Sequence, residues 1–177
     1  MVPSAKPQKN HNPLKDKDIM PRKVTKSLKR IIPPDRVYNN VLISKTINKV
    51  MNDGKKQIAE RLVYSAIEQA AVKTKVEPTE VLETAVKNVA PAVMVKSKRI
   101  GGANYQVPME VKGDRKTHYA LIWILDSARN KSGKSFDKRL ANELINAYNN
   151  EGDAIKKKQD AHQMAEANKA FAHFARY

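Results

Sequence analysis

The residues with the most distinctive chemistry in this chain lie in one short segment, Lys96–Pro108. The segment holds the cations Lys96, Lys98 and Arg99, the pair Gly101 and Gly102, the amides Asn104 and Gln106, and the ring of Tyr105. Cations neutralise phosphates, glycines let a backbone approach them, and a tyrosine can stack on an unpaired base. The pattern favours contact with loops or single strands of RNA. From the residues alone, an ordinary soluble hairpin remains the alternative.

Further basic clusters occur at Lys55-Lys56, Arg115-Lys116 and Lys156-Lys157-Lys158. Taken singly, such a cluster is more often a solvated face than a binding site. The whole chain, however, has 34 Lys and Arg against 18 Asp and Glu, a formal charge of +16. A compact body with this charge repels itself unless phosphates or counterions surround it. We therefore interpret the clusters as parts of one polyanion-binding surface.

Nucleotide hydrolysis and thiol chemistry are not supported by the sequence. Gly133-Lys134-Ser135 is similar to the end of a P-loop, but Ala128 stands where that motif needs a glycine, and a helix is expected where it needs a strand. A helix cap at Ser135 explains the segment. The absence of cysteine excludes disulfides, thiol nucleophiles and cysteine-based zinc sites.

The histidines do not form a recognisable catalytic or metal site either. His162 and Glu166 are four residues apart on a predicted helix and could supply two metal ligands, but no third ligand is evident. A hydrogen-bonded pair or a contact with RNA is the better interpretation. His118 and His173 have no serine or carboxylate partner in a known motif. We expect no enzyme activity, no metal and no cofactor.

Residues 1–36 are expected to form a basic N-terminal arm. They include ten Lys and Arg against three Asp, several prolines and few large apolar side chains. Such a segment cannot bury enough surface to fold alone, so we expect it to be disordered until it meets RNA. The cations that we expect to contact phosphates there are Arg22, Lys23, Lys26, Lys29 and Arg30.

No segment predicts a membrane span. The longest aliphatic stretches, such as Ala120–Leu125, fall far short of the ~20 apolar residues that a spanning helix requires. No apolar segment follows the basic amino terminus, which argues against a secretory signal. We expect an intracellular protein without a membrane partner.

The rest of the chain, residues 37–177, predicts a single helical domain. The hydrophobic fraction of 41% suffices for one core. Apolar residues recur at helical spacing in six segments, which predicts six helices. They run from Tyr38 to a stop near Gly54, capped by Asn39 or Asn40, then over 57–74, from Pro78 to Pro91, over 115–130 after an Asp114 cap, from a Ser135 cap to Gly152, and from an Asp153 cap towards Phe171.

Within these helices, the inward residues are expected to be the apolar ones of each stripe. In the second helix the stripe is Ile58, Leu62, Ala66, Ile67 and Ala70. In the third it is Val81, Leu82, Ala85, Val86 and Val89, and in the fourth it is Ala120, Leu121, Ile124, Leu125 and Ala128. The stripe of the fifth helix consists of Leu140, Leu144, Ile145 and Tyr148. Trp123 is expected to fill space in the core.

The pattern changes to a period of two at about residues 92–112, which predicts a β-hairpin. Val93–Lys98 alternates, and Val107, Met109 and Val111 resume the alternation after the glycine pair. We expect a wide, basic tip. Pro108 removes a backbone donor, so its strand should be an edge of a free-standing ribbon. The predicted fold class is mainly α, a six-helix body with one protruding β-hairpin arm.

Three motifs together resemble the S-seven family of small-subunit ribosomal proteins, in its bacterial or organellar form. They are Asp53-Gly54-Lys55-Lys56, Arg99–Pro108, and the stretch from Lys156-Lys157-Lys158 through Met164–Phe174. They follow the family's order, and the resemblance covers about Met20 to Tyr177. Gly113 and Ile122 depart from the family pattern, and residues 1–19 form an extension with no role specified by the family.

The resemblance implies a structural, rRNA-binding function and partners. Such proteins bind the 3′ major domain of small-subunit rRNA, organise the head of the subunit, and lie near the exit-site tRNA, messenger RNA and neighbouring small-subunit proteins. By this resemblance, Arg99, Gly101, Gly102, Asn104, Tyr105, Gln106, His162, Phe171 and Phe174 would lie near the exit site. The basic clusters named above would bind rRNA. The location would be the ribosome in the cytoplasm, or in an organelle matrix or stroma.

Two other functions remain to be distinguished from this one. A basic body with a proline-bearing β-arm also suits a DNA-architectural protein, although such an arm usually has an apolar wedge at its tip. An RNA-processing enzyme is disfavoured by the missing acid–base pair or metal cluster. Preference for duplex DNA over folded rRNA, or RNA cleavage that is lost on changing His162 or Glu166, would support these alternatives.

Overall fold

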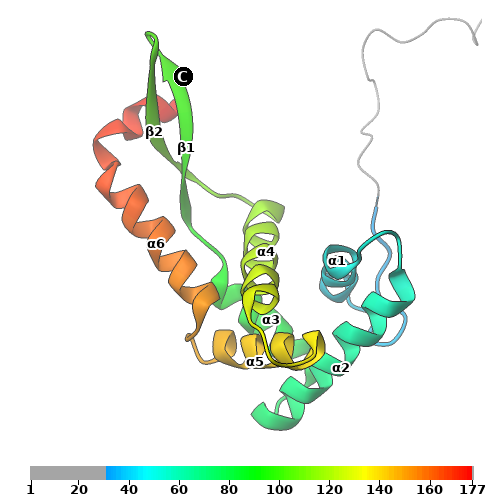
Figure 1. The fold of residues 1–177 in the computed structure, drawn as a ribbon. Helices are drawn as coiled ribbons and strands as arrows, with labels where there is room; N and C mark the ends of the chain where they lie inside the picture. Colours follow the sequence, from blue (N-terminus) through cyan, green and yellow to red (C-terminus); the bar gives the residue numbers. More distant parts are fainter. Residues whose placement is uncertain (1–30, 177) are drawn as a thin grey trace, which may run out of the picture. The chain divides into compact units, whose positions relative to one another are not determined.

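The computed structural model describes residues 31–176, and the residues from Ile32 onward form one compact unit. Its elements are α1 (Val41–Val50), α2 (Lys56–Thr74), α3 (Pro78–Val89), β1 (Val93–Ile100), β2 (Ala103–Glu110), α4 (Asp114–Asn130), α5 (Phe136–Tyr148), α6 (Asp153–Ala167) and the 3₁₀ helix η1 (Lys169–Arg176) (Figure 1). The predicted class, mainly helical with one hairpin, is confirmed. Residues 1–30 of the expected basic arm lie outside the described residues.

The helices enclose a single apolar core. Its largest fully buried hydrophobic side chains come from α1 to α5 and include Ile43, Ile47, Ile67, Leu82, Leu121, Ile124, Leu140 and Leu144. Burying each such side chain contributes roughly 1.5–3 kcal/mol, which offsets the entropy lost when the chain is ordered. The predicted stripes of α3 and α4 are buried throughout, and Trp123 packs against this core.

The inward face of α2 differs from the predicted one. Ile58 is 47% exposed, whereas Ala59 and Val63 are buried together with the predicted Ala66, Ile67 and Ala70. The reason is that α2 packs against α1, α3 and α5. Three of the five buried residues are alanines, which let these helix axes approach closely. Ile58 lies nine residues before Ile67 and therefore on about the opposite side of the helix, away from the contact.

The entry into α1 is fixed by two side-chain caps. Asn40 is the N-cap, and its side chain accepts a hydrogen bond from the Leu42 N–H at 2.7 Å, as predicted. Before it, the buried Asp35 accepts hydrogen bonds from the backbone N–H of Val37 and Tyr38 and from the Tyr64 hydroxyl, the last at 2.6 Å. Burial opposes ionisation, but these donors outweigh it and lower the pKa of Asp35.

The ends of three other segments depart from prediction. Helix α1 stops at Val50, and Gly54 instead occupies the following turn with φ +73°. Asp114 and Asp153 are first helical residues, and Gly113 and Gly152 hold the cap positions with positive φ. A carboxylate in the first turn still interacts favourably with the helix dipole. Ser135 is the N-cap of α5, as predicted, but makes no capping hydrogen bond.

The hairpin has a narrower tip than the predicted one. The strands pair from Val93 and Glu110 up to Ile100 and Ala103, so only Gly101 and Gly102 form the turn. Both glycines have positive φ, +57° and +89°. A two-residue turn of this kind matches the twist of the strands and favours glycine at both positions, which is why no wider loop is needed.

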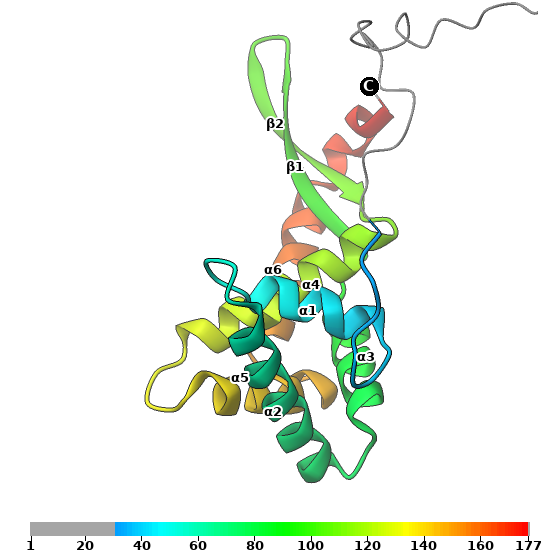
Figure 2. The ribbon, with the colours of Figure 1, turned by 90° about the vertical axis from the view of Figure 1, so that its right-hand side faces the viewer.

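No third strand joins the ribbon within residues 31–176, as predicted, but helices support it on both strands. Helix α6 packs against β1, and η1 packs against β2 (Figures 1 and 2). The last helix also stops earlier than predicted, at Ala167, where the side chain of Asn168 donates to the Met164 carbonyl at 2.8 Å. The following 3₁₀ turns bring residues three apart onto one side, so Phe171 and Phe174 both face β2.

Candidate nucleic-acid interface

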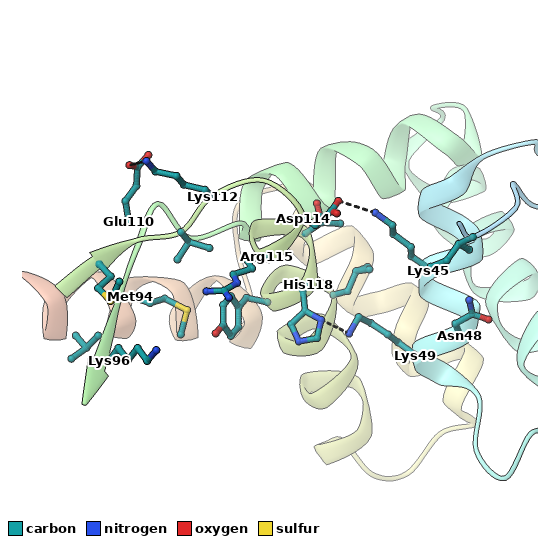
Figure 3. A pocket seen from close by; sticks show the side chains of 17 residues that line it. Lys45, Asn48, Lys49, Met94, Lys96, Glu110, Lys112, Asp114, Arg115 and His118 are labelled. Atoms are coloured by element: carbon teal, nitrogen blue, oxygen red, sulfur yellow. Dashed lines mark hydrogen bonds and ion pairs between the residues drawn. The ribbon is translucent and has the colours of Figure 1, made fainter. Parts of the chain in front are cut away.

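A groove of about 1070 Å³ lies between α1, the base of the ribbon and the start of α4 (Figure 3). Lys45 and Lys49 are one turn apart on α1 and therefore share a face of that helix. The ribbon contributes Lys96, the link after β2 contributes Lys112, and the first turn of α4 contributes Arg115. Helix α1, the ribbon and the segment that begins α4 thus each place cations along the same groove.

The groove has a surplus of positive charge. Its five Lys and Arg face two carboxylates, Glu110 and Asp114, which gives a formal charge of +3. Lys45 lies 3.2 Å from Asp114 and Lys112 lies 3.4 Å from Glu110. Exposed pairs of this kind contribute little stability, so they orient the lysines more than they hold the fold together. The surplus suits a polyanionic ligand.

Lys49 and His118 face each other across the groove. The Lys49 Nζ and the His118 Nδ1 are 2.9 Å apart, so a neutral imidazole accepts the hydrogen bond of the ammonium (Figure 3). Burial and the adjacent Lys49 charge both lower the pKa of His118 below its ordinary value of 6.5. Burial also lowers the pKa of Lys49. The contact directs the Lys49 ammonium towards α4.

Changing Lys49 to Met should raise the pKa of His118, though not fully to 6.5, because burial is the larger cause of its depression. The native contact stabilises the fold fully above pH 6.5, and this contribution decreases as the pH falls, because the unfolded chain then binds the proton more readily. NMR titration of the four histidines measures the shift. An unchanged His118 titration in the variant, with the other three as internal controls, would contradict the pairing.

The structure divides the predicted rRNA-binding residues among several places. Lys96 and Arg115 line the groove, whereas Lys55, Lys56, Lys116, Arg99, Lys98 and Lys156–Lys158 do not. Lys55 and Lys56 begin α2, where Lys56 lies 3.8 Å from Glu60. Lys158 donates to the Asn88 carbonyl at 2.7 Å and so caps the last turn of α3. Arg22, Lys23, Lys26, Lys29 and Arg30 lie outside the described residues.

Lys98, predicted to bind rRNA, and Tyr105, predicted to lie near the exit site, both hold the ribbon to η1. The Lys98 Nζ donates to the Phe174 carbonyl at 3.0 Å. The ring of Tyr105 packs against Phe171 and Phe174, with centroid distances of 5.3 and 5.4 Å. Phe171 and Phe174 therefore anchor η1 on β2. Stacking of Tyr105 on a base stays a prediction.

His162 has a positioning role in the structure. Its Nε2 accepts a hydrogen bond from the backbone N–H of Ala92 at 3.1 Å, which holds α6 beside the start of β1. Glu166 is exposed one turn later. Over residues 31–176, no group of three His, Asp or Glu is placed to hold a metal ion. Gly133-Lys134-Ser135 follows α4, a helix, where a P-loop would follow a strand.

Sequence reasoning missed four groove residues, Lys45, Lys49, Lys112 and His118. A usable signal existed for the first two, because they are four residues apart on a predicted helix and both lie off its apolar stripe. Lys112 and His118 lie within three residues of the Arg115-Lys116 cluster, but no spacing marks them as part of it. Only the packing of the ribbon base against α4 brings them to the same hollow.

A helical body with a supported ribbon and a cation-lined groove has the charge distribution of a polyanion-binding protein. Comparison with known proteins agrees: residues 21–169 match the family described as ribosomal protein S7p/S5e. The chain belongs to this family, whose members are structural, non-enzymatic components of the ribosome.

Its curated relatives are similar over most of their length. Each is named small ribosomal subunit protein uS7. The relative from Thermosipho africanus is 57% identical over 82% of this chain and 94% of its own length, and the one from Chloroflexus aggregans is 55% identical over 84% and 94%. The relative from Roseiflexus sp. (strain RS-1) is 54% identical over 89% of this chain and all of its own length.

Proposed function

We propose that this chain is a constituent of the small ribosomal subunit that binds the 3′ major domain of small-subunit rRNA and organises the head. The observation that carries the proposal is the groove, in which five cations from α1, the ribbon and α4 converge with a net charge of +3. Phosphate contacts of this kind supply most of the affinity for nucleic acid and fix its orientation. The small-subunit names of the relatives support the assignment.

The finer part of the proposal concerns the ribbon. We infer that its tip lies near the exit-site tRNA and messenger RNA. Arg99 and Asn104 are cross-strand partners beside the glycine turn, and both are exposed. A guanidinium and an amide side by side can contact phosphate and base edges together. Lys98 and Tyr105, directly below them, hold this end of the ribbon to η1.

The partners that follow are rRNA, exit-site tRNA and mRNA, and neighbouring small-subunit proteins. The cellular location would be the ribosome of the cytoplasm or of an organelle. Among the helices of residues 31–176, none is long and apolar enough to cross a membrane. The proposed function needs no cofactor, since charge neutralisation and shape recognition suffice.

Co-sedimentation tests the assembly role. The tagged full-length chain should remain with small subunits after a high-salt wash, and in vitro it should prefer a 3′ major domain transcript to duplex DNA of equal length. Release from the subunits together with preference for the duplex would favour a DNA-architectural function instead. A transcript of another rRNA domain, matched in length, controls for charge alone.

A further inference from the structure

We propose that the groove receives the base of an unpaired nucleotide on an apolar floor of Met94, Met109 and Tyr119, while the surrounding cations hold the adjacent phosphates. The inference rests on the proposed function and specifies the form of RNA that the groove takes. Each floor residue lines the same hollow as Lys49, Lys96 and Arg115.

The floor is built from two elements that fix it in place. Met94 and Met109 are cross-strand partners, so their side chains lie next to each other on one face of the ribbon. Tyr119 projects from α4, where its ring lies 6.2 Å from that of Trp123 and 5.6 Å from that of His118, measured between centroids. Trp123 in turn packs against the core. Trp123 therefore holds the ring of Tyr119 in place against the core.

All three floor side chains are only half-buried, so they present apolar surface to the groove. Thioether groups make favourable contacts with aromatic rings and adapt to their shape, and tyrosine stacks on bases of any identity. A base inside a duplex is covered by its neighbours and cannot offer its face. The floor therefore fits a base that is unstacked, as in RNA loops and bulges.

The cations are placed to hold the backbone of such a nucleotide. Arg115 is one helical turn before Tyr119 and shares its face of α4. Lys96 lies two residues after Met94 and so on the same face of β1. Figure 3 shows Met94 and Lys96 on the ribbon side of the groove and Arg115 and His118 on the α4 side. A charged rim thus surrounds the apolar floor.

Size and charge select this occupant over others. A volume of about 1070 Å³ slightly exceeds the roughly 300–1,000 Å³ of pockets that bind small ligands, so a base and its flanking phosphates fit. The net charge of +3 favours an anionic ligand. An acidic peptide would satisfy the cations but would leave Met94, Met109 and Tyr119 without apolar contacts.

Two oligomers of equal charge separate base recognition from phosphate binding. Fluorescence anisotropy with the full-length chain compares hexauridylate with a hexamer of abasic ribose phosphates. We expect hexauridylate to bind about tenfold more tightly or better. The double variant Met94→Ser, Met109→Ser should remove this preference. Met164→Ser, a change of an exposed methionine on α6 that does not line the groove, is the matched control and should retain it.

The outcomes separate this inference from the proposed function. Equal affinity for both hexamers, with a head-domain transcript still bound, overturns the inference and leaves the proposed function in place. Failure to bind the transcript rejects both. Hexa-aspartate that competes as well as hexauridylate would show a general anion groove and also overturn the inference.

A second measurement does not depend on whether the double variant folds. Photo-cross-linking of hexa-5-iodouridylate to the native chain, followed by mass spectrometry, should label peptides that contain Met94, Met109 or Tyr119. Labelling confined to peptides outside the groove would overturn the inference. Labelling of the floor that hexa-aspartate fails to suppress would support it further.

Discussion

Raising monovalent salt from about 50 to about 200 mM should weaken binding of the full-length chain to a head-domain rRNA transcript by about 10³ to 10⁵-fold. The estimate assumes that about six to ten phosphates are neutralised, each releasing condensed counterions on binding. The groove supplies five of the cations that we expect to contact these phosphates. Filter binding or anisotropy across a salt series measures the slope of log K against log salt. A flat response would reject charge neutralisation as the mechanism.

Neutralising the groove should reduce that slope. The triple variant Lys45→Gln, Lys49→Gln, Arg115→Gln removes three cations from the hollow, and each phosphate contact contributes about 0.7–0.9 to the slope. We expect a decrease of about 2 to 3. Lys75→Gln, Lys87→Gln, Lys138→Gln removes the same charge from exposed lysines that do not line the groove. Equal changes in the two variants would show that the groove is not the main contact.

Changing Lys131 to Met should lower the free energy of unfolding by about 3 kcal/mol or more. The carboxylate of Glu143 is fully buried on α5, where it accepts hydrogen bonds from the Lys131 ammonium and, at 3.1 Å, from the backbone N–H of Ala154. Lys131 lies in the link after α4 and Ala154 in the first turn of α6. One carboxylate therefore joins three helices, and without Lys131 its charge is buried uncompensated.

Urea denaturation with a double-mutant cycle tests this contact. Lys131→Met combined with Glu143→Gln should be closer to the native chain than Lys131→Met alone, because the neutral amide can still accept from Ala154 and no charge is left buried. Lys134→Met, an exposed lysine in the same link, should change the free energy of unfolding by less than about 0.5 kcal/mol. Equal stability of Lys131→Met and Lys134→Met would contradict the role of the ion pair.

The helical body was predictable because its signals are local. The stripes of α3 and α4 are spaced by three and four residues and are all buried. Pro78 marks the start of α3, as its fixed φ and missing N–H allow. The period-two pattern around the glycine pair located both strands of the ribbon. Each of these features depends on a few neighbouring residues, so one sequence suffices to recognise it.

The contacts between distant segments were not predictable in the same way. Lys98 and Lys158 each donate to a backbone carbonyl more than sixty residues away, and no sequence pattern predicted these contacts. Nothing in a basic cluster distinguishes a lysine that binds a ligand from one that caps a helix. The buried Glu143 was also missed, although its place between Leu140 and Ala147 on the apolar face of α5 was a usable sign.

The groove was only partly predictable for the same reason. Arg115 and Lys96 were predicted as binding residues from their basic clusters. The groove that they line exists because the base of the ribbon lies beside α1 and α4. Sequence patterns located the ribbon and the helices separately. The relative placement of these elements depends on tertiary packing, which has no short-range signature.

The support of the ribbon by α6 and η1 has a consequence for the order of events during translation. The bond from Lys98 to Phe174 spans 76 residues and that from Ala92 to His162 spans 70. At about 5–20 residues per second, a growing chain needs roughly 4–15 s to make the second partner after the first. Each nascent copy therefore carries an unbraced hairpin with unpaired edges for seconds, the interval in which an early RNA ligand or a chaperone would protect it from aggregation.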